Sequence, residues 1–151
     1  MLRTRLSDAL KVAMKAKEGR AVSTLRLIHA GLKDRDIAAR SNGNMDGIGD
    51  DDILSLFQSM VKQRRESIDA YQRGGRMELA QKEAEEISII ENFLPEQMAE
   101  EQIAVVISEV ITKIGASNLK DMGKVMAVLK ETYAGCMDFG KASGLVKARL
   151  G

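Results

Sequence analysis

The sequence predicts an all-α protein in two helical lobes, and three observations support this prediction. Apolar residues recur at three- and four-residue spacing along nearly all of the 151 residues, and no segment alternates at period two. Only 3% of the residues are aromatic and nine are Met, which suits packing between helices because Met and Leu are unbranched at Cβ. The single proline, Pro95, interrupts the helical pattern. We therefore predict four helices in residues 1–94 and three shorter ones in residues 95–151.

The N-terminal lobe has clear breaks between its expected helices. A Glu18-Gly19 break separates the first helix from the second, whose pattern fades near Arg40. A loop rich in Asn and Gly follows, and its acidic end can cap the next helix because carboxylates are favoured at a helix N-terminus. Gly74-Gly75 ends the third helix. The expected bounds are residues 41–52 for the loop, about Asp51 to Arg73 for the third helix and about Met77 to Phe93 for the fourth.

The segment Leu94-Pro95-Glu96-Gln97 predicts a hinge between the lobes, because proline ends helices and restricts the residue before it. Three apolar stripes of helical spacing follow the hinge, and Gly115 closes the first of them. The stripes cover residues 103–114, 119–129 and 142–150.

The chain contains only one cysteine and one histidine, which limits the catalytic and metal sites that it can form. Cys136 has no partner for a disulfide, and His29 cannot form a histidine metal cluster or a triad with a second histidine. The acids in residues 42–50 lack the glycine and the bidentate Glu that a calcium loop requires at fixed offsets. No glycine-rich segment is preceded by the strand that a phosphate-binding loop requires. We expect no catalytic residue, no metal and no cofactor.

The expected location is the cytoplasm. Low cysteine usage fits a reducing compartment, and no apolar run approaches the roughly 18 residues of a membrane span. The basic, amphipathic start of the chain resembles a transit peptide, but it contains Asp8 and continues into the second helix. We therefore interpret it as the first structural helix.

Two groups of cations are candidates for contact with phosphates. The formal net charge is only +1, but residues 115–151 contain six Lys and Arg against three Asp and Glu. A second cluster lies in the third helix, where Glu66 and Asp69 follow it and favour a solvated, ion-paired face. The C-terminal candidates are Lys120, Lys124, Lys130, Lys141, Lys147 and Arg149, and those of the third helix are Lys62, Arg64 and Arg65.

Three segments resemble the GatB/YqeY family over essentially the whole chain. The most specific is the twelve-residue stretch Gly115–Met126, and Phe93–Met98 precedes it. The stretch Val61–Ile68 is similar to a segment of the freestanding YqeY-like members, and it is followed by a Gly75-Arg76 turn and an acidic helix.

The resemblance implies a link to tRNA. The family includes a tail domain of the B subunit of tRNA-dependent amidotransferase, which helps to hold the tRNA while the enzyme forms the amide. The catalytic body of that subunit has no counterpart in this chain, so any carbon–nitrogen ligase activity with glutamine as amide donor is inherited from the larger enzyme.

The family motif also has a structural interpretation. Gly115 stops a helix, Ser117 or Asn118 caps the next one, and Asp121 lies in its first turn. Gly123 allows close approach by a neighbouring helix or by a phosphate backbone. Where family members show Gly-Arg-Ala-Asp-Gly, this chain has the segment Gly135–Gly140, which keeps Asp138 as a helix cap but lacks the arginine.

Two functions remain open from the sequence. The protein is expected to bind tRNA or another structured RNA through its C-terminal lobe, without catalysis. The alternative is a module for docking a protein partner, with no RNA and no membrane involved. The oligomeric state is left open.

Overall fold

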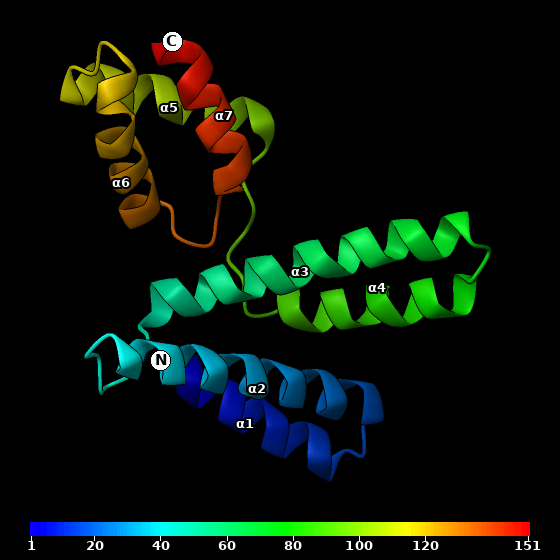
Figure 1. Cartoon of the computed structure of the whole chain (residues 1–151). Helices are drawn as coiled ribbons and strands as arrows, with labels where there is room; N and C mark the ends of the chain where they lie inside the picture. The colour runs from blue at the N-terminus through cyan, green and yellow to red at the C-terminus, as the bar shows by residue number, and fades with distance from the viewer. The chain divides into compact units, whose positions relative to one another are not determined.

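The computed structural model describes residues 1–151 and confirms the all-α class, with seven α-helices and no strand. The chain divides into two compact units, Met1–Leu94 and Pro95–Gly151. The first unit contains α1 (Leu2–Lys15), α2 (Gly19–Ser41), α3 (Asp50–Arg73) and α4 (Met77–Glu91). The second contains α5 (Glu100–Ile114), the short 3₁₀ turn η1 (Leu119–Asp121), α6 (Met122–Thr132) and α7 (Phe139–Leu150). Figure 1 shows α1 to α4, which belong to the first unit, and α5 to α7, which belong to the second.

The first unit consists of two helical hairpins, α1 with α2 and α3 with α4, that share one apolar core. Phe57 and Ile53 of α3, with Ile28 of α2, are completely buried in it. The ring of Phe57 lies 6.0 Å from that of Phe93, and the Arg5 guanidinium lies 5.4 Å above the Phe93 ring. The side chains of the α4–Pro95 connection therefore complete this core.

The basic start of the chain is α1, as predicted. Leu2, Leu6 and Ala13 of this helix are buried in the core. The helix ends at a tight turn in which Lys17 adopts a left-handed backbone conformation with φ 57°.

A hydrogen-bonded network holds the loop between α2 and α3. Both Asp36 oxygens accept from the Arg3 guanidinium at 2.8 and 2.9 Å, and Asp36 Oδ1 also accepts from the Ile48 N–H at 2.9 Å. These bonds hold the pKa of Asp36 at about 2, with the Arg3 hydrogen bond as the largest cause. Gly49 precedes α3 and Asp50, the first of three acids, occupies its first turn. The acids therefore act through the helix dipole rather than by a side-chain cap.

The second unit has a separate core at the centre of its three helices. Ile107 of α5, Val125 and Leu129 of α6, and Val146 of α7 are completely buried. Met137, in the connection before α7, is also completely buried. The two cores do not share a buried residue.

Candidate nucleic-acid interface

The family motif begins at the turn that ends α5. Gly115 adopts φ 70°, a left-handed conformation that glycine reaches without strain. Its N–H donates to the Thr112 carbonyl at 3.3 Å, and the next N–H, of Ala116, donates to the Ile111 carbonyl at 3.1 Å. The predicted role of Gly115 in stopping the helix is confirmed.

Residues 117–121 form a reciprocal cap around η1. Asn118 Oδ1 accepts from the Lys120 N–H at 2.9 Å, while Asp121 Oδ2 accepts from the N–H groups of Ser117 at 2.9 Å and Asn118 at 3.4 Å. The hydrogen bond from the Ser117 N–H is the main reason why the pKa of Asp121 is lowered. Of the two predicted caps, Asn118 accepts the hydrogen bond, and Asp121 reaches back instead of only meeting the dipole.

Gly123, in the first turn of α6, is open to solvent. A Cβ built at Gly123 would meet no atom within 4 Å, so no helix of this chain lies against it. Lys124, next to it, is exposed. The first turn of α6 therefore has no side chain at Gly123 and lies beside an exposed lysine.

The C-terminal cations separate into two groups at opposite ends of the second unit. Figure 1 shows α6 and α7 running in opposite directions, and η1 contacts the end of α7, where a Leu119 methyl lies near Gly151. Lys120 and Lys124 therefore lie at the end of the unit that also carries the last turn of α7, with Lys147 and Arg149. All four side chains are exposed and form no ion pair. We call these four residues the basic end.

The other two cations are at the far end. Lys130 lies in the last turn of α6 and Lys141 in the first turn of α7. Lys141 Nζ pairs with Glu100 Oε1 at 3.2 Å, which reduces its availability to a phosphate. The six predicted candidates thus do not form one surface.

The segment after Pro95 is fastened to the connection between α6 and α7. Gln97 Nε2 donates to the Gly135 carbonyl at 2.5 Å, and the Met98 N–H donates to the Cys136 carbonyl at 2.7 Å. Asp138 then caps α7, as predicted, by accepting from the N–H groups of Gly140 at 2.9 Å and Lys141 at 3.2 Å. The hydrogen bonds of Gln97 and Met98 therefore hold together two segments that resemble the family, the one after Pro95 and the one before α7.

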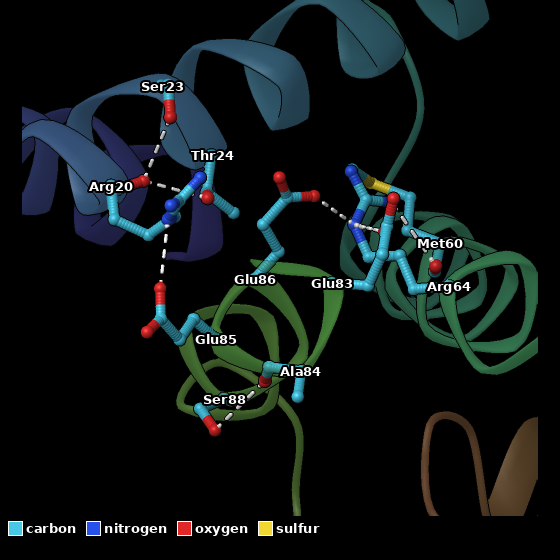
Figure 2. Close-up of polar contacts among 10 residues, drawn as sticks. All are labelled: Arg20, Ser23, Thr24, Met60, Arg64, Glu83, Ala84, Glu85, Glu86 and Ser88. Atoms are coloured by element: carbon cyan, nitrogen blue, oxygen red, sulfur yellow. Dashed lines mark hydrogen bonds and ion pairs between the residues drawn. The ribbon is translucent and has the colours of Figure 1, made fainter. Parts of the chain in front are cut away.

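The three candidate cations of α3 differ in how far they are buried. Lys62 and Arg65 are exposed, but the Arg64 side chain is only 12% exposed. Figure 2 shows Arg64 directed toward α4, where its Nε donates to Glu86 Oε2 at 2.8 Å, while Nη1 donates to the Met60 carbonyl at 3.2 Å. Arg64 is therefore part of the packing between α3 and α4 and is not on a phosphate-facing surface.

Glu86 also differs from its expected environment. A glutamate four residues after a lysine, as Glu86 is after Lys82, is typical of an exposed helix face, but Glu86 is 5% exposed and pairs with Arg64 instead. A second carboxylate, Glu83, lies 3.9 Å from the same Arg64 nitrogen. The spacing along α4 alone does not show which of these acids faces the core.

No group of three or more His, Cys, Asp or Glu side chains is placed to hold a metal ion. None of the helices is both long enough and apolar enough to cross a membrane.

Several yeast proteins are similar to this chain. The "Altered inheritance of mitochondria protein 41, mitochondrial" of Lachancea thermotolerans is 28% identical over 151 residues, which cover 96% of this chain and 76% of that protein. The protein of the same name from Eremothecium gossypii is 38% identical over 102 residues, 66% of this chain and 54% of the relative. A third, from Kluyveromyces lactis, is 29% identical over 74% of this chain and 60% of the relative.

The names of these relatives contradict the cytoplasmic location predicted from the sequence, because all three are called mitochondrial. The prediction was based on a single cysteine and on the absence of a long apolar run. These features show that disulfides are not needed, but they do not distinguish among compartments in which thiols stay reduced.

The match to a protein-family model extends over nearly the whole chain. Residues 3–150 match the family described as "Yqey-like protein", a range that includes both units and the capped turn at Asn118. The chain belongs to the YqeY-like family.

Proposed function

We propose that the protein binds tRNA or another structured RNA through the basic end of its second unit. The observation that carries this proposal is the exposure of four unpaired cations around the open first turn of α6. Phosphates bind to the side chains of Lys and Arg, and the positive end of a helix dipole adds to this attraction. Because Gly123 has no side chain, a phosphate backbone can approach this turn closely.

The basic end suits phosphate contact better than base readout. It contains no aromatic residue on which a base could stack, and three of its four cations are lysines, which meet phosphates as point charges. Cys136 and Met137 occupy the segment in which family members carry an arginine, and Met137 points into the core. The proposed contact is therefore weakly sequence-specific and dependent on salt.

Binding of a labelled tRNA against salt concentration tests this proposal. We expect the logarithm of the binding constant to fall linearly with the logarithm of salt concentration, with a slope that reports several phosphate contacts. Lys124→Glu should weaken binding and reduce the slope by about one. Lys130→Glu, on the same helix but at the far end, is the matched control and should have a smaller effect.

Two results would count against RNA binding. One is weak binding that does not respond to salt, and the other is an equal loss from Lys124→Glu and Lys130→Glu. Either result would favour the alternative of a docking module for a protein partner.

The family resemblance also leads us to propose an association with a tRNA-dependent amidotransferase. Purified protein, mischarged tRNA, glutamine and ATP should give no amide product without that enzyme, while addition of the protein should lower the tRNA concentration that the enzyme needs. An unchanged requirement for tRNA would argue against the association.

A further inference from the structure

A groove in the first unit has the features of a ligand site and lies outside the basic end. Its volume is about 660 Å³, within the range of sites that hold small molecules. One wall is a continuous face of α2 together with the turn before it, and the other is α4. The groove is lined by Lys17, Gly19, Val22, Ser23, Arg26, Leu27, Lys82 and Glu86.

Three cations from three different elements surround the groove. Lys17 comes from the turn between α1 and α2, Arg26 from α2 and Lys82 from α4. All three are exposed, and none forms an ion pair. Several cations around a hollow of low polarity concentrate a positive potential there. An anionic group of a ligand is favoured at this rim.

Lys17 supports this interpretation independently. It is the only non-glycine residue of the chain with a positive φ, at 57°. Glycine would adopt this conformation freely, whereas a residue with a side chain is strained in it. The chain therefore places a lysine at the groove in spite of a local conformational cost.

Glu86 gives the groove a polar acceptor among buried surroundings. The residue is 5% exposed, and Arg64 contacts only one of its two carboxylate oxygens, Oε2. The other oxygen, Oε1, has no partner, and Figure 2 shows it directed away from Arg64. A carboxylate oxygen that faces solvent and has no donor within the protein can accept from a ligand N–H group, and its charge repels a phosphate.

The remaining lining residues provide apolar surface. Val22 is half-buried, and the Leu27 side chain is 49% exposed although it is large and apolar. A ligand with a flat or apolar body would cover Leu27 and reduce this exposed area.

We propose that the groove binds a small organic phosphate with an N–H donor at its other end, as in a nucleotide whose base carries an amino group. The phosphates lie at Lys17, Arg26 and Lys82, and the body of the ligand covers Leu27. The amino group donates to Glu86 Oε1, the pairing by which a carboxylate accepts from the cytosine amino group. A nucleic-acid backbone fits less well, because Glu86 places a carboxylate and Leu27 an apolar side chain in the groove beside the cations.

Calorimetric titration with CTP, UTP and inorganic triphosphate tests the proposal. CTP and UTP share their sugar and phosphates, but CTP has an amino group where UTP has a carbonyl oxygen. We expect CTP to bind about tenfold more tightly than UTP, and triphosphate to bind most weakly. Equal binding of CTP and UTP, or triphosphate binding as tight as that of CTP, would overturn the proposal.

Two variants separate the phosphate contacts from the amino contact. Arg26→Glu should weaken CTP and UTP by the same factor, at least about tenfold, because it acts on the shared phosphates. Glu86→Gln should bring the ratio of CTP to UTP affinity close to one, because an amide can donate as well as accept. An unchanged ratio in Glu86→Gln would contradict the assigned role of Glu86.

Variants on α2 keep the test valid if Glu86→Gln unfolds the protein. Leu27→Asp changes the groove without touching the buried ion pair, and it should abolish CTP binding while thermal unfolding remains cooperative. Ile37→Asp and Lys33→Glu are the matched controls, because Ile37 is 50% exposed and both residues lie on α2 outside the groove. Losses in these controls that equal those of Leu27→Asp and Arg26→Glu would overturn the proposal.

Discussion

Gly47 is the glycine at which the least space remains for a side chain. Its φ is +88°, and a Cβ there would lie 2.7 Å from Asp36 Oδ1 and 2.8 Å from Arg3 Nη2. Any side chain at Gly47 would therefore disturb the ion pair that holds the loop between α2 and α3.

We expect Gly47→Ala to lower the free energy of unfolding by at least about 2 kcal/mol, because backbone strain and a collision add together. Gly43→Ala is the control, since Gly43 has φ +90° but open space around it, and about 1 kcal/mol is expected there. Urea unfolding of both variants measures the difference. A larger loss at Gly43 would contradict the collision at Gly47.

Asp36 makes the stability depend on acid. Its pKa in the folded state is about 2, below the ordinary 3.8, so its contribution is fully present above about pH 4 and is lost as the pH falls through 2. Asp36→Asn should therefore flatten the dependence of the unfolding free energy on pH between 4 and 2. Denaturant unfolding at several pH values measures this.

Asp8→Asn is the control for that experiment, because Asp8 lies on the exposed face of α1 without a hydrogen bond or ion pair. An unaltered pH dependence in Asp36→Asn would show that the Arg3 pair does not contribute to acid stability.

The α3–α4 hairpin depends on an ion pair between its helices. Removal of the Arg64 guanidinium would leave Glu86, and Glu83 beside it, without a positive partner in a buried site. We expect Arg64→Ala to lower the free energy of unfolding by about 3 kcal/mol, and Arg65→Ala by less than about 0.5 kcal/mol, because the Arg65 side chain is 66% exposed. Chemical denaturation measures both losses, and similar losses would contradict the buried pair.

The helices themselves could be predicted from the sequence because the signals are local. Apolar spacing indicated each helix, the Gly74-Gly75 pair indicated the end of α3, and Gly115 indicated the end of α5. The end of α4 was placed two residues late, at Phe93 instead of Glu91. The apolar Phe93 continues the helical pattern, but it packs on the core from the turn that follows α4.

The pairings between helices could not be predicted in the same way. Arg64 follows Val61 by three residues and precedes Ile68 by four, so it lies on the apolar stripe of α3, which was the available signal. Its charge nevertheless favoured a surface position. A long guanidinium can cross the gap to another helix, and only the packed structure shows that Glu86 is opposite.

At the scale of the whole molecule, each unit encloses its own core. Thirteen buried residues form the first core, all within residues 1–94, and Leu94 packs against them. We expect a fragment of residues 1–94 to be helical and to unfold cooperatively by circular dichroism, because the fragment keeps every residue of this core. A broad, uncooperative transition would show that residues 1–94 are not an independent domain.

The candidate sites were less predictable than the helices. The C-terminal cations were recognised as a group, but their division between two ends depends on the antiparallel course of α6 and α7. The α2–α4 groove was not predicted. Its cations are far apart in the sequence, from Lys17 to Lys82, and ordinary surface lysines have the same local pattern.

The fastening of Gln97 and Met98 to Gly135 and Cys136 has a practical consequence. Cys136 is the only cysteine, is half-buried, and accepts from the Met98 N–H through its own carbonyl group. Its thiol is thus a natural reporter at this joint, and its alkylation rate, compared with that of the unfolded chain, measures how much this turn protects it. No engineered label is needed to compare the protection of this one part of the chain among variants.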